Sequence, residues 1–141
     1  MIKPGDDLAT IILAALAASQ EKLCDGDVLV LAQKIVSKAE GAIVDLREMR
    51  PSALAQSWAE EWKKDARLIE LILAQSRRIV KMDRGVIIAE TRHGLVCANA
   101  GVDQSNVEGD DFATVLPNDP DASARALRRS DGSASAPSRF R

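Results

Sequence analysis

The sequence has no tyrosine, and its aromatic content is only 3%. Aromatic side chains are the stacking platforms of proteins that bind single-stranded nucleic acids, so that class is disfavoured. The formal net charge of -2 also argues against binding to phosphate backbones through overall charge. We therefore expect no nucleic-acid partner.

Cysteine, histidine and long apolar runs are equally scarce. Two cysteines, Cys24 and Cys97, provide neither a disulfide framework nor a zinc site, and His93 is the only histidine. The apolar run at 11–18 is far shorter than the roughly 20 residues that a membrane span needs. No signal peptide is visible, and a reduced cytoplasm is the default for such a chain. We therefore expect a cytoplasmic protein with no membrane segment.

What is present indicates a soluble globular fold, since 46% of the 141 residues are hydrophobic and 28% are charged. Asp83–Gly85 predicts a hairpin turn, and hence antiparallel pairing of its flanking strands. We expect an α+β fold with a mixed, largely antiparallel sheet and packed helices. The predicted helices are 7–21, 51–64, 66–75 and 122–129, and the predicted strands are 28–32, 42–46, 78–82, 86–91 and 95–98. The strand at 28–32 is expected to be buried on both faces.

Capping residues refine these helices, and two polar segments near the N-terminus remain to be explained. Asp6 and Asp7 predict an N-cap and a first-turn acid, and Asp121 predicts the cap of the last helix. Gln33, Lys34, Ser37 and Lys38 follow the predicted strand at 28–32. Lysines at a strand end are suited to nucleotide phosphates, and the alternative is a solvated turn.

The loop at 99–106 is the densest polar segment of the chain. It holds a carboxylate, a hydroxyl and amides around one glycine, directly after a predicted strand. Asp103 could ligate Mg²⁺ together with waters and phosphate oxygens, and Asn106 could contact a base or ribose. An Asx-turn without a ligand is the alternative. His93, beside a glycine, is interpreted as a turn residue.

Together, these segments resemble the coenzyme F420 glutamyl ligase family. The resemblance covers about residues 2–128, with the matching motifs in family order and with family-like spacing. The matching runs are Ile2–Leu8, Asp25–Val28, Lys34–Gly41, Glu90–Val107 and Leu116–Ala124.

The resemblance implies an activity and its co-substrates. The family attaches L-glutamate by an amide bond to a deazaflavin coenzyme precursor, using GTP, Mg²⁺ or Mn²⁺, and K⁺. It implies an acyl-phosphate intermediate, for which positioning and charge neutralisation suffice without a protein nucleophile. It also implies a homodimer. Asp103 matches a metal-ligand position, and Gln33, Lys34, Lys38 and Asn106 match GTP contacts.

The resemblance also predicts that the chain is an incomplete domain. Residues 1–129 correspond to the N-terminal part of the ligase domain, and 130–141 are expected to be a disordered or aberrant tail. A family Asp-Thr motif that supplies further metal ligands has no counterpart after Arg129. We therefore expect the chain alone to have little or no ligase activity.

Two alternatives remain open. One is a non-catalytic GTP-binding or dimerisation module derived from the ligase, which would bind GTP without turnover. The other is a nucleic-acid binder that uses Arg125, Arg128 and Arg129, and the low aromatic content and acidic body disfavour it.

Overall fold

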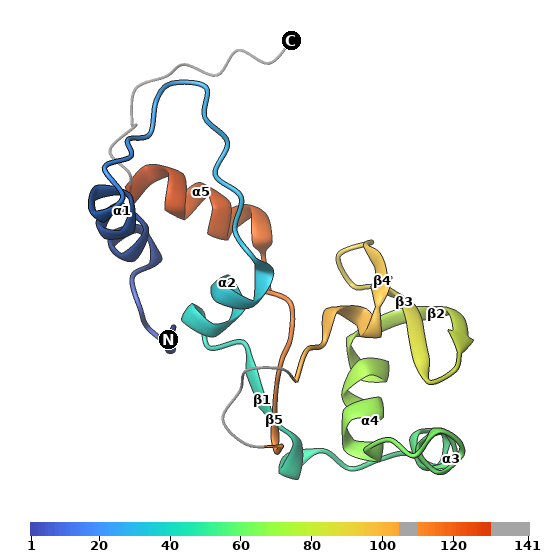
Figure 1. Cartoon of the computed structure of the whole chain (residues 1–141). Helices are drawn as coiled ribbons and strands as arrows, with labels where there is room; N and C mark the ends of the chain where they lie inside the picture. The colour runs from blue at the N-terminus through green and yellow to red at the C-terminus, as the bar shows by residue number, and fades with distance from the viewer. Residues whose placement is uncertain (105–109, 131–141) are drawn as a thin grey trace. The chain divides into compact units, whose positions relative to one another are not determined.

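The computed structural model describes residues 1–104 and 110–130 (Figure 1). The chain divides into two compact units, which are described separately: unit 1 is Met1–Gly41 with the chain from Pro117 onward, and unit 2 is Ala42–Leu116. Helices combine with two antiparallel sheets, so the predicted α+β class is confirmed. Most of the tail predicted at 130–141 lies outside the described residues.

The described part of unit 1 contains three helices, α1 (Leu8–Ala18), α2 (Gln33–Ala39) and α5 (Pro120–Ser130), and α1 contacts α5. The predicted cap of α1 is confirmed, because the Asp7 carboxylate accepts hydrogen bonds from two backbone amides of the first turn. The predicted cap of α5 is wrong. Asp119 Oδ1 accepts from the Ala122 amide at 2.8 Å, which places Asp121 inside the helix.

Two predictions for the residues between α1 and the end of α2 are wrong. The strand predicted at 28–32 does not form, and Val28 and Val30 are 83% and 84% exposed rather than buried. The following residues form α2 instead of a polar connection at a strand end. No strand lies beside this apolar run in the described part of unit 1. High β-propensity without a partner strand is not sufficient to form a β-strand.

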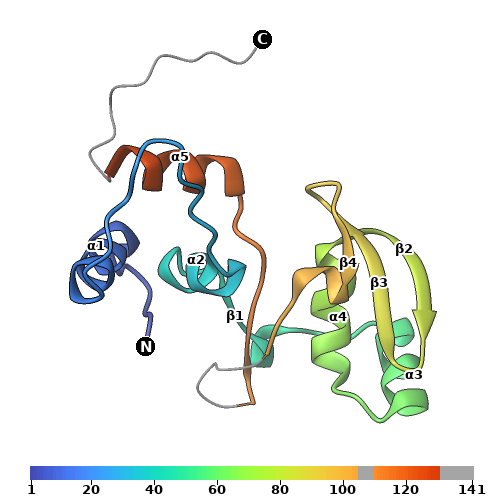
Figure 2. The ribbon, with the colours of Figure 1, turned by 45° about the horizontal axis from the view of Figure 1, so that its top comes forward.

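Unit 2 contains both sheets (Figure 2). In the first, β1 (Ile43–Asp45) pairs with β5 (Phe112–Thr114). In the second, β3 (Val86–Thr91) lies between β2 (Ser76–Asp83) and β4 (Val96–Ala98). The predicted hairpin is confirmed: Arg84 and Gly85 both have positive φ, of 49° and 75°, as a type I′ turn requires.

The described residues of unit 2 also form two helices and two short 3-10 turns. Helix α3 (Ala53–Trp62) begins at Ser52, whose side chain accepts from the Ala55 amide, and α4 (Ala66–Gln75) begins at Asp65 in the same way. The 3-10 turns are η1 (Leu46–Glu48) and η2 (Asn99–Gly101). Helix α4 lies beside the β2–β3–β4 sheet in Figure 2, and its apolar face supplies Ile69, Leu71 and Ile72 to the core.

The helices are too short or too polar to cross a membrane in the part of the chain that the structure describes.

Candidate functional site

The three predicted GTP contacts of unit 1 all lie on α2. Gln33 opens the helix, and Lys34 and Lys38 follow one turn apart, so they share a helical face. Ser37 is fully buried and Lys38 is only 9% exposed. The Gln33 amide nitrogen donates to the Ser37 hydroxyl, one turn further along the helix. Two ammonium groups on one face suit the oxygens of a polyphosphate.

Asp103 is held in unit 2 by the strand β5. Its backbone forms an isolated antiparallel bridge with Thr114, through N–H···O bonds of 3.0 and 2.8 Å. The Thr114 hydroxyl, which is fully buried, also donates to the Asp103 carbonyl oxygen at 3.0 Å. The backbone of the predicted metal ligand is therefore fixed, while the residue itself is only partly buried.

A strained turn precedes Asp103. Asn99, Ala100 and Gly101 all have positive φ, of 52°, 52° and 73°. The left-handed region costs roughly 1–2 kcal/mol for each residue that is not glycine. Two hydrogen bonds hold the turn: Asn99 Oδ1 accepts from the Ile87 amide at 3.3 Å, and the Asn99 carbonyl accepts from the Val102 amide at 2.9 Å. Strain of this kind is concentrated at functional sites, which favours the site interpretation over a simple Asx-turn.

The remaining predicted contact, Asn106, lies outside the described residues. The structure thus brings Gln33, Lys34 and Lys38 together on one helix of unit 1 and holds Asp103 in unit 2. The described residues contain no group of three or more His, Cys, Asp or Glu side chains placed to hold a metal ion.

Sequence reasoning missed Thr114 as the residue that clamps Asp103. The signal was available, because 112–116 is the apolar, β-branched run Phe-Ala-Thr-Val-Leu typical of a short strand. The helix-breaking residues at 117–121, which follow this run, were interpreted as the start of a helix.

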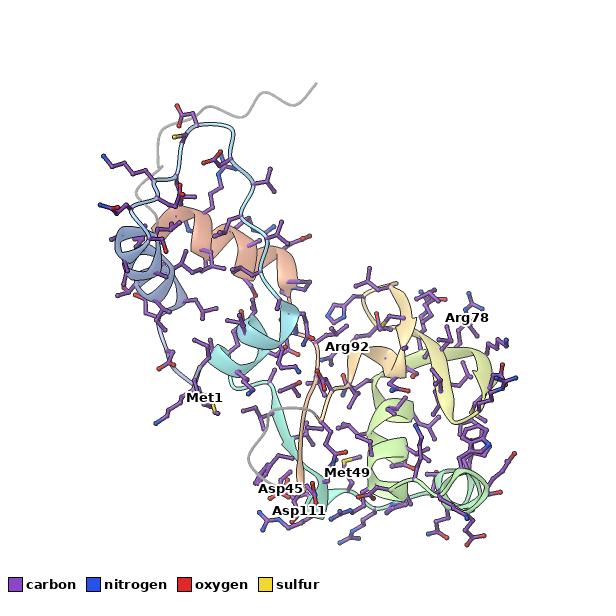
Figure 3. All side chains as sticks on the ribbon, viewed as in Figure 1. Met1, Asp45, Met49, Arg78, Arg92 and Asp111 are labelled. Atoms are coloured by element: carbon purple, nitrogen blue, oxygen red, sulfur yellow. The ribbon has the colours of Figure 1, made fainter. Side chains whose placement is uncertain are left out.

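A charged cluster in unit 2 braces the end of the β1–β5 ladder. Figure 3 shows Asp45 and Asp111 beside each other there. Arg67 pairs with both Asp65 and Asp111, at 2.7 and 2.8 Å, and Arg47 pairs with Asp45 at 2.5 Å. Hydrogen bonds donated by Arg47 lower the pKa of Asp45 to about 2, and the hydrogen bonds that Arg67 donates to Asp65 and Asp111 raise the pKa of Arg67. Because each of the three carboxylates is paired with an arginine of unit 2, we interpret the cluster as structural.

A hollow of about 190 Å³ in unit 1 is unsuited to a nucleotide. It is lined by the start of α1, the end of α2 and one face of α5, and its charged groups are Asp6, Asp7 and Glu40. Carboxylates repel phosphate oxygens, so this hollow is not a second candidate for the GTP site.

Comparison with known proteins decides the family. A family model described as F420-0:Gamma-glutamyl ligase matches residues 1–130, which include all five predicted site residues. The chain belongs to this glutamyl ligase family.

Curated relatives in this family agree with the match. The chain is 50% identical over 129 residues to the coenzyme F420:L-glutamate ligase of Methanothermobacter thermautotrophicus, covering 92% of this chain and 51% of that protein. It is 49% identical over 128 residues to the Methanopyrus kandleri ligase, covering 91% and 48%. For the Archaeoglobus fulgidus ligase the identity is 40% over 129 residues, covering 92% and 49%. The chain therefore spans about half the length of the curated relatives it matches.

Proposed function

We propose that this chain supplies phosphate and metal contacts to a GTP-dependent ligase that adds L-glutamate to a coenzyme F420 precursor. The observation that carries the proposal is the family match, which runs through both units and includes α2 and the Asp103 strand. Within that match, the two lysines on one face of α2 have the charge that bound GTP requires.

The proposed chemistry proceeds through an acyl phosphate. A carboxylate oxygen of the precursor attacks the γ-phosphorus of GTP, a new O–P bond forms, and the bond to the β-phosphate oxygen breaks to release GDP. The amine of glutamate then attacks the acyl carbon, the carbon–oxygen bond to phosphate breaks, and the amine gives up a proton. Inorganic phosphate leaves and an amide remains. Lys34 and Lys38 would neutralise phosphate oxygens in both steps.

Asp103 fits a divalent cation of the magnesium type. Mg²⁺ is commonly bound by one or two carboxylates together with waters and substrate phosphates, so a single anchored carboxylate is a suitable donor. The backbone clamp to Thr114 fixes the position of the residue, and its partial exposure leaves room for a ligand. When bound, the ion would neutralise charge on the nucleotide phosphates.

The other properties that the family resemblance implies stay predictions: use of Mn²⁺ in place of Mg²⁺, activation by K⁺, a homodimer, a cytoplasmic location and a contact from Asn106 to GTP. Titration of activity with KCl, compared with NaCl, would test activation by K⁺. Light scattering, which measures the mass in solution, would test the homodimer.

Calorimetric titration of the 141-residue chain with GTP, with and without Mg²⁺, tests the proposal. We expect Lys34→Met to weaken GTP binding by about tenfold or more, the effect of losing one charge-assisted contact. Asp103→Asn, which keeps the shape of the side chain, should weaken binding only when Mg²⁺ is present. Lys81→Met is the matched control, because Lys81 lies on β2 and pairs with Asp83. Unchanged binding in both site variants would refute the proposal.

A second candidate, the non-catalytic GTP-binding or dimerisation module, is favoured by one observation: the match covers only about half of each relative. The two candidates differ in a single assay. When the chain is mixed with the portion of a relative outside the match, glutamate addition supports the ligase, whereas GTP binding without any amide product supports the module.

A further inference from the structure

The two units differ sharply in how much apolar surface they bury. The core cluster, from Leu46 to Val115, lies entirely within unit 2. Among the described residues of unit 1, the buried aliphatic side chains are only Leu8 and Ala9. A polypeptide of this size needs a buried core to offset the entropy of ordering its backbone, so unit 1 by itself is short of apolar burial.

Helix α1 has the composition of a buried helix but not the burial. Thr10 is its only polar residue, and yet Ile11 and Leu13 are 40% and 42% exposed. A helix that is apolar on all sides belongs in the interior of a protein rather than on its surface. The exposed face of α1 is therefore suited to contact with a further element.

The segment Val28–Leu31 is likewise suited to contact with a further element. It comprises four consecutive aliphatic residues with high β-propensity, and Figures 1 and 2 draw it as part of the long connection between α1 and α2. Within the described part of the chain, none of its backbone N–H or C=O groups has a hydrogen-bond partner. Its ends are fixed, because Asp27 Oδ2 accepts from the Cys24 amide at 2.8 Å before it and α2 begins soon after it. Unpaired backbone beside exposed aliphatic side chains is the arrangement that accepts an added strand.

We propose that unit 1 is an acceptor for a second polypeptide segment, which adds a β-strand to Val28–Leu31 and covers α1. The occupant is an apolar strand from the part of the ligase fold that the match does not cover. The relatives support this choice, because the match accounts for only 51% and 48% of their lengths. The flanking carboxylates of Asp25 and Asp27 disfavour an anionic lipid surface as the occupant.

Hydrogen exchange on the full 141-residue chain tests the pairing, without GTP or glutamate. The probe is the portion of the Methanothermobacter relative outside the match, produced as a separate polypeptide and mixed with the chain. We expect a complex of one copy of each, in which exchange of the amides of Val28–Leu31 and α1 slows by about tenfold or more. Formation of this complex would not depend on whether the proposed ligase activity is correct.

The variant Val30→Lys should weaken the complex by about tenfold or more, because it places a charge within the paired strand. Since Val30 is 84% exposed, the substitution should leave the isolated chain folded. Val80→Lys is the matched control, a valine on β2 that is 45% exposed in unit 2, and it should bind the probe normally.

Three results would overturn the proposal. One is exchange at Val28–Leu31 that stays unchanged after mixing. Another is an equal loss of binding in Val30→Lys and Val80→Lys. The third is protection of the segment in the chain alone that grows with its concentration, which would identify a second copy as the occupant.

Discussion

Thr114 and Asp103 are joined by three hydrogen bonds: two between their backbones and one from the Thr114 hydroxyl to the Asp103 carbonyl oxygen. A strand residue thereby fixes the backbone of the residue whose carboxylate we propose as a metal ligand. We expect Thr114→Val to reduce the free energy of unfolding by about 1 kcal/mol, the net value of one buried hydrogen bond. Urea unfolding measures this loss, and amide exchange at Asp103 should accelerate.

Thr91→Val is the matched control for that variant. Thr91 is equally buried, and its hydroxyl oxygen accepts from the amides of His93 and Leu95 in the other sheet. It should lose stability without accelerating exchange at Asp103. A Thr114→Val protein with unchanged Asp103 exchange would show that the hydroxyl does not hold the strand.

Gly101→Ala should be among the most damaging single changes in unit 2. A Cβ built on Gly101 would lie 2.6 Å from Leu116 Cδ2, and the residue has φ of +73°. We expect a loss of about 2–4 kcal/mol, which combines left-handed strain with overpacking. Comparing the free energies of unfolding of Gly101→Ala and Gly94→Ala in denaturant separates the left-handed strain from the overpacking. Gly94 has φ of +80° and no atom within 4 Å of the added Cβ, so only the strain should remain. Equal losses would contradict the clash with Leu116.

The pairing of Asp45 with Arg47 makes unit 2 sensitive to acid. Because the folded-state pKa of Asp45 is about 2, below its ordinary 3.8, the carboxylate stabilises the fold above about pH 4. That contribution is lost as the pH falls from about 4 towards 2. We expect NMR titration to give a pKa near 2 for Asp45, and Arg47→Gln to move it towards 3.8. Arg78→Gln should leave it unchanged, since Arg78 pairs with Glu90. An Asp45 pKa that Arg47→Gln does not alter would contradict the assignment.

Asp7→Ala should fray the start of α1. The Asp7 carboxylate accepts from the amides of Ala9 and Thr10, at 3.0 and 3.3 Å, and the Thr10 hydroxyl donates to it at 2.7 Å. Losing an N-cap costs about 1 kcal/mol, so amide exchange at Ala9 and Thr10 should accelerate about fivefold. Asp7→Asn retains an acceptor and should accelerate exchange less. Identical exchange in the two variants would mean that the cap hydrogen bonds do not stabilise the helix.

Local signals in the sequence predicted much of unit 2. Helix α4 spans the predicted residues 66–75, and Arg84–Gly85 forms the predicted hairpin turn. Both features depend on residues close together in sequence. The pairing of β5 with β1 was not predicted, because it joins residues about seventy positions apart, such as Ile43 and Thr114. The composition of 112–116 is typical of a strand, but it does not indicate which distant segment pairs with it.

Unit 1 was predicted less well, for a different physical reason. Val28–Leu31 has the composition of a buried strand, but composition cannot indicate whether a partner strand is present. The Gln33–Lys38 segment was placed after that strand and was therefore assigned to a connection, although it forms a helix. Lys34 and Lys38, four residues apart, lie on one face of that helix, and their contact with GTP stays a prediction. Asn106 remains an untested prediction.

The concentration of buried aliphatic residues in unit 2 has a calorimetric consequence. Cooperative melting comes from elements that share a packed core, and here that core runs from Leu46 to Val115. The heat absorbed by unit 2 should be about 50 kcal/mol near 60 °C, the typical value for a polypeptide of its length. Unit 1, with Leu8 and Ala9 as its buried aliphatics, should add a broad, weak transition to the thermogram. The transition temperature of the chain would then report the stability of one unit, and a ligand of α2 could bind without shifting it.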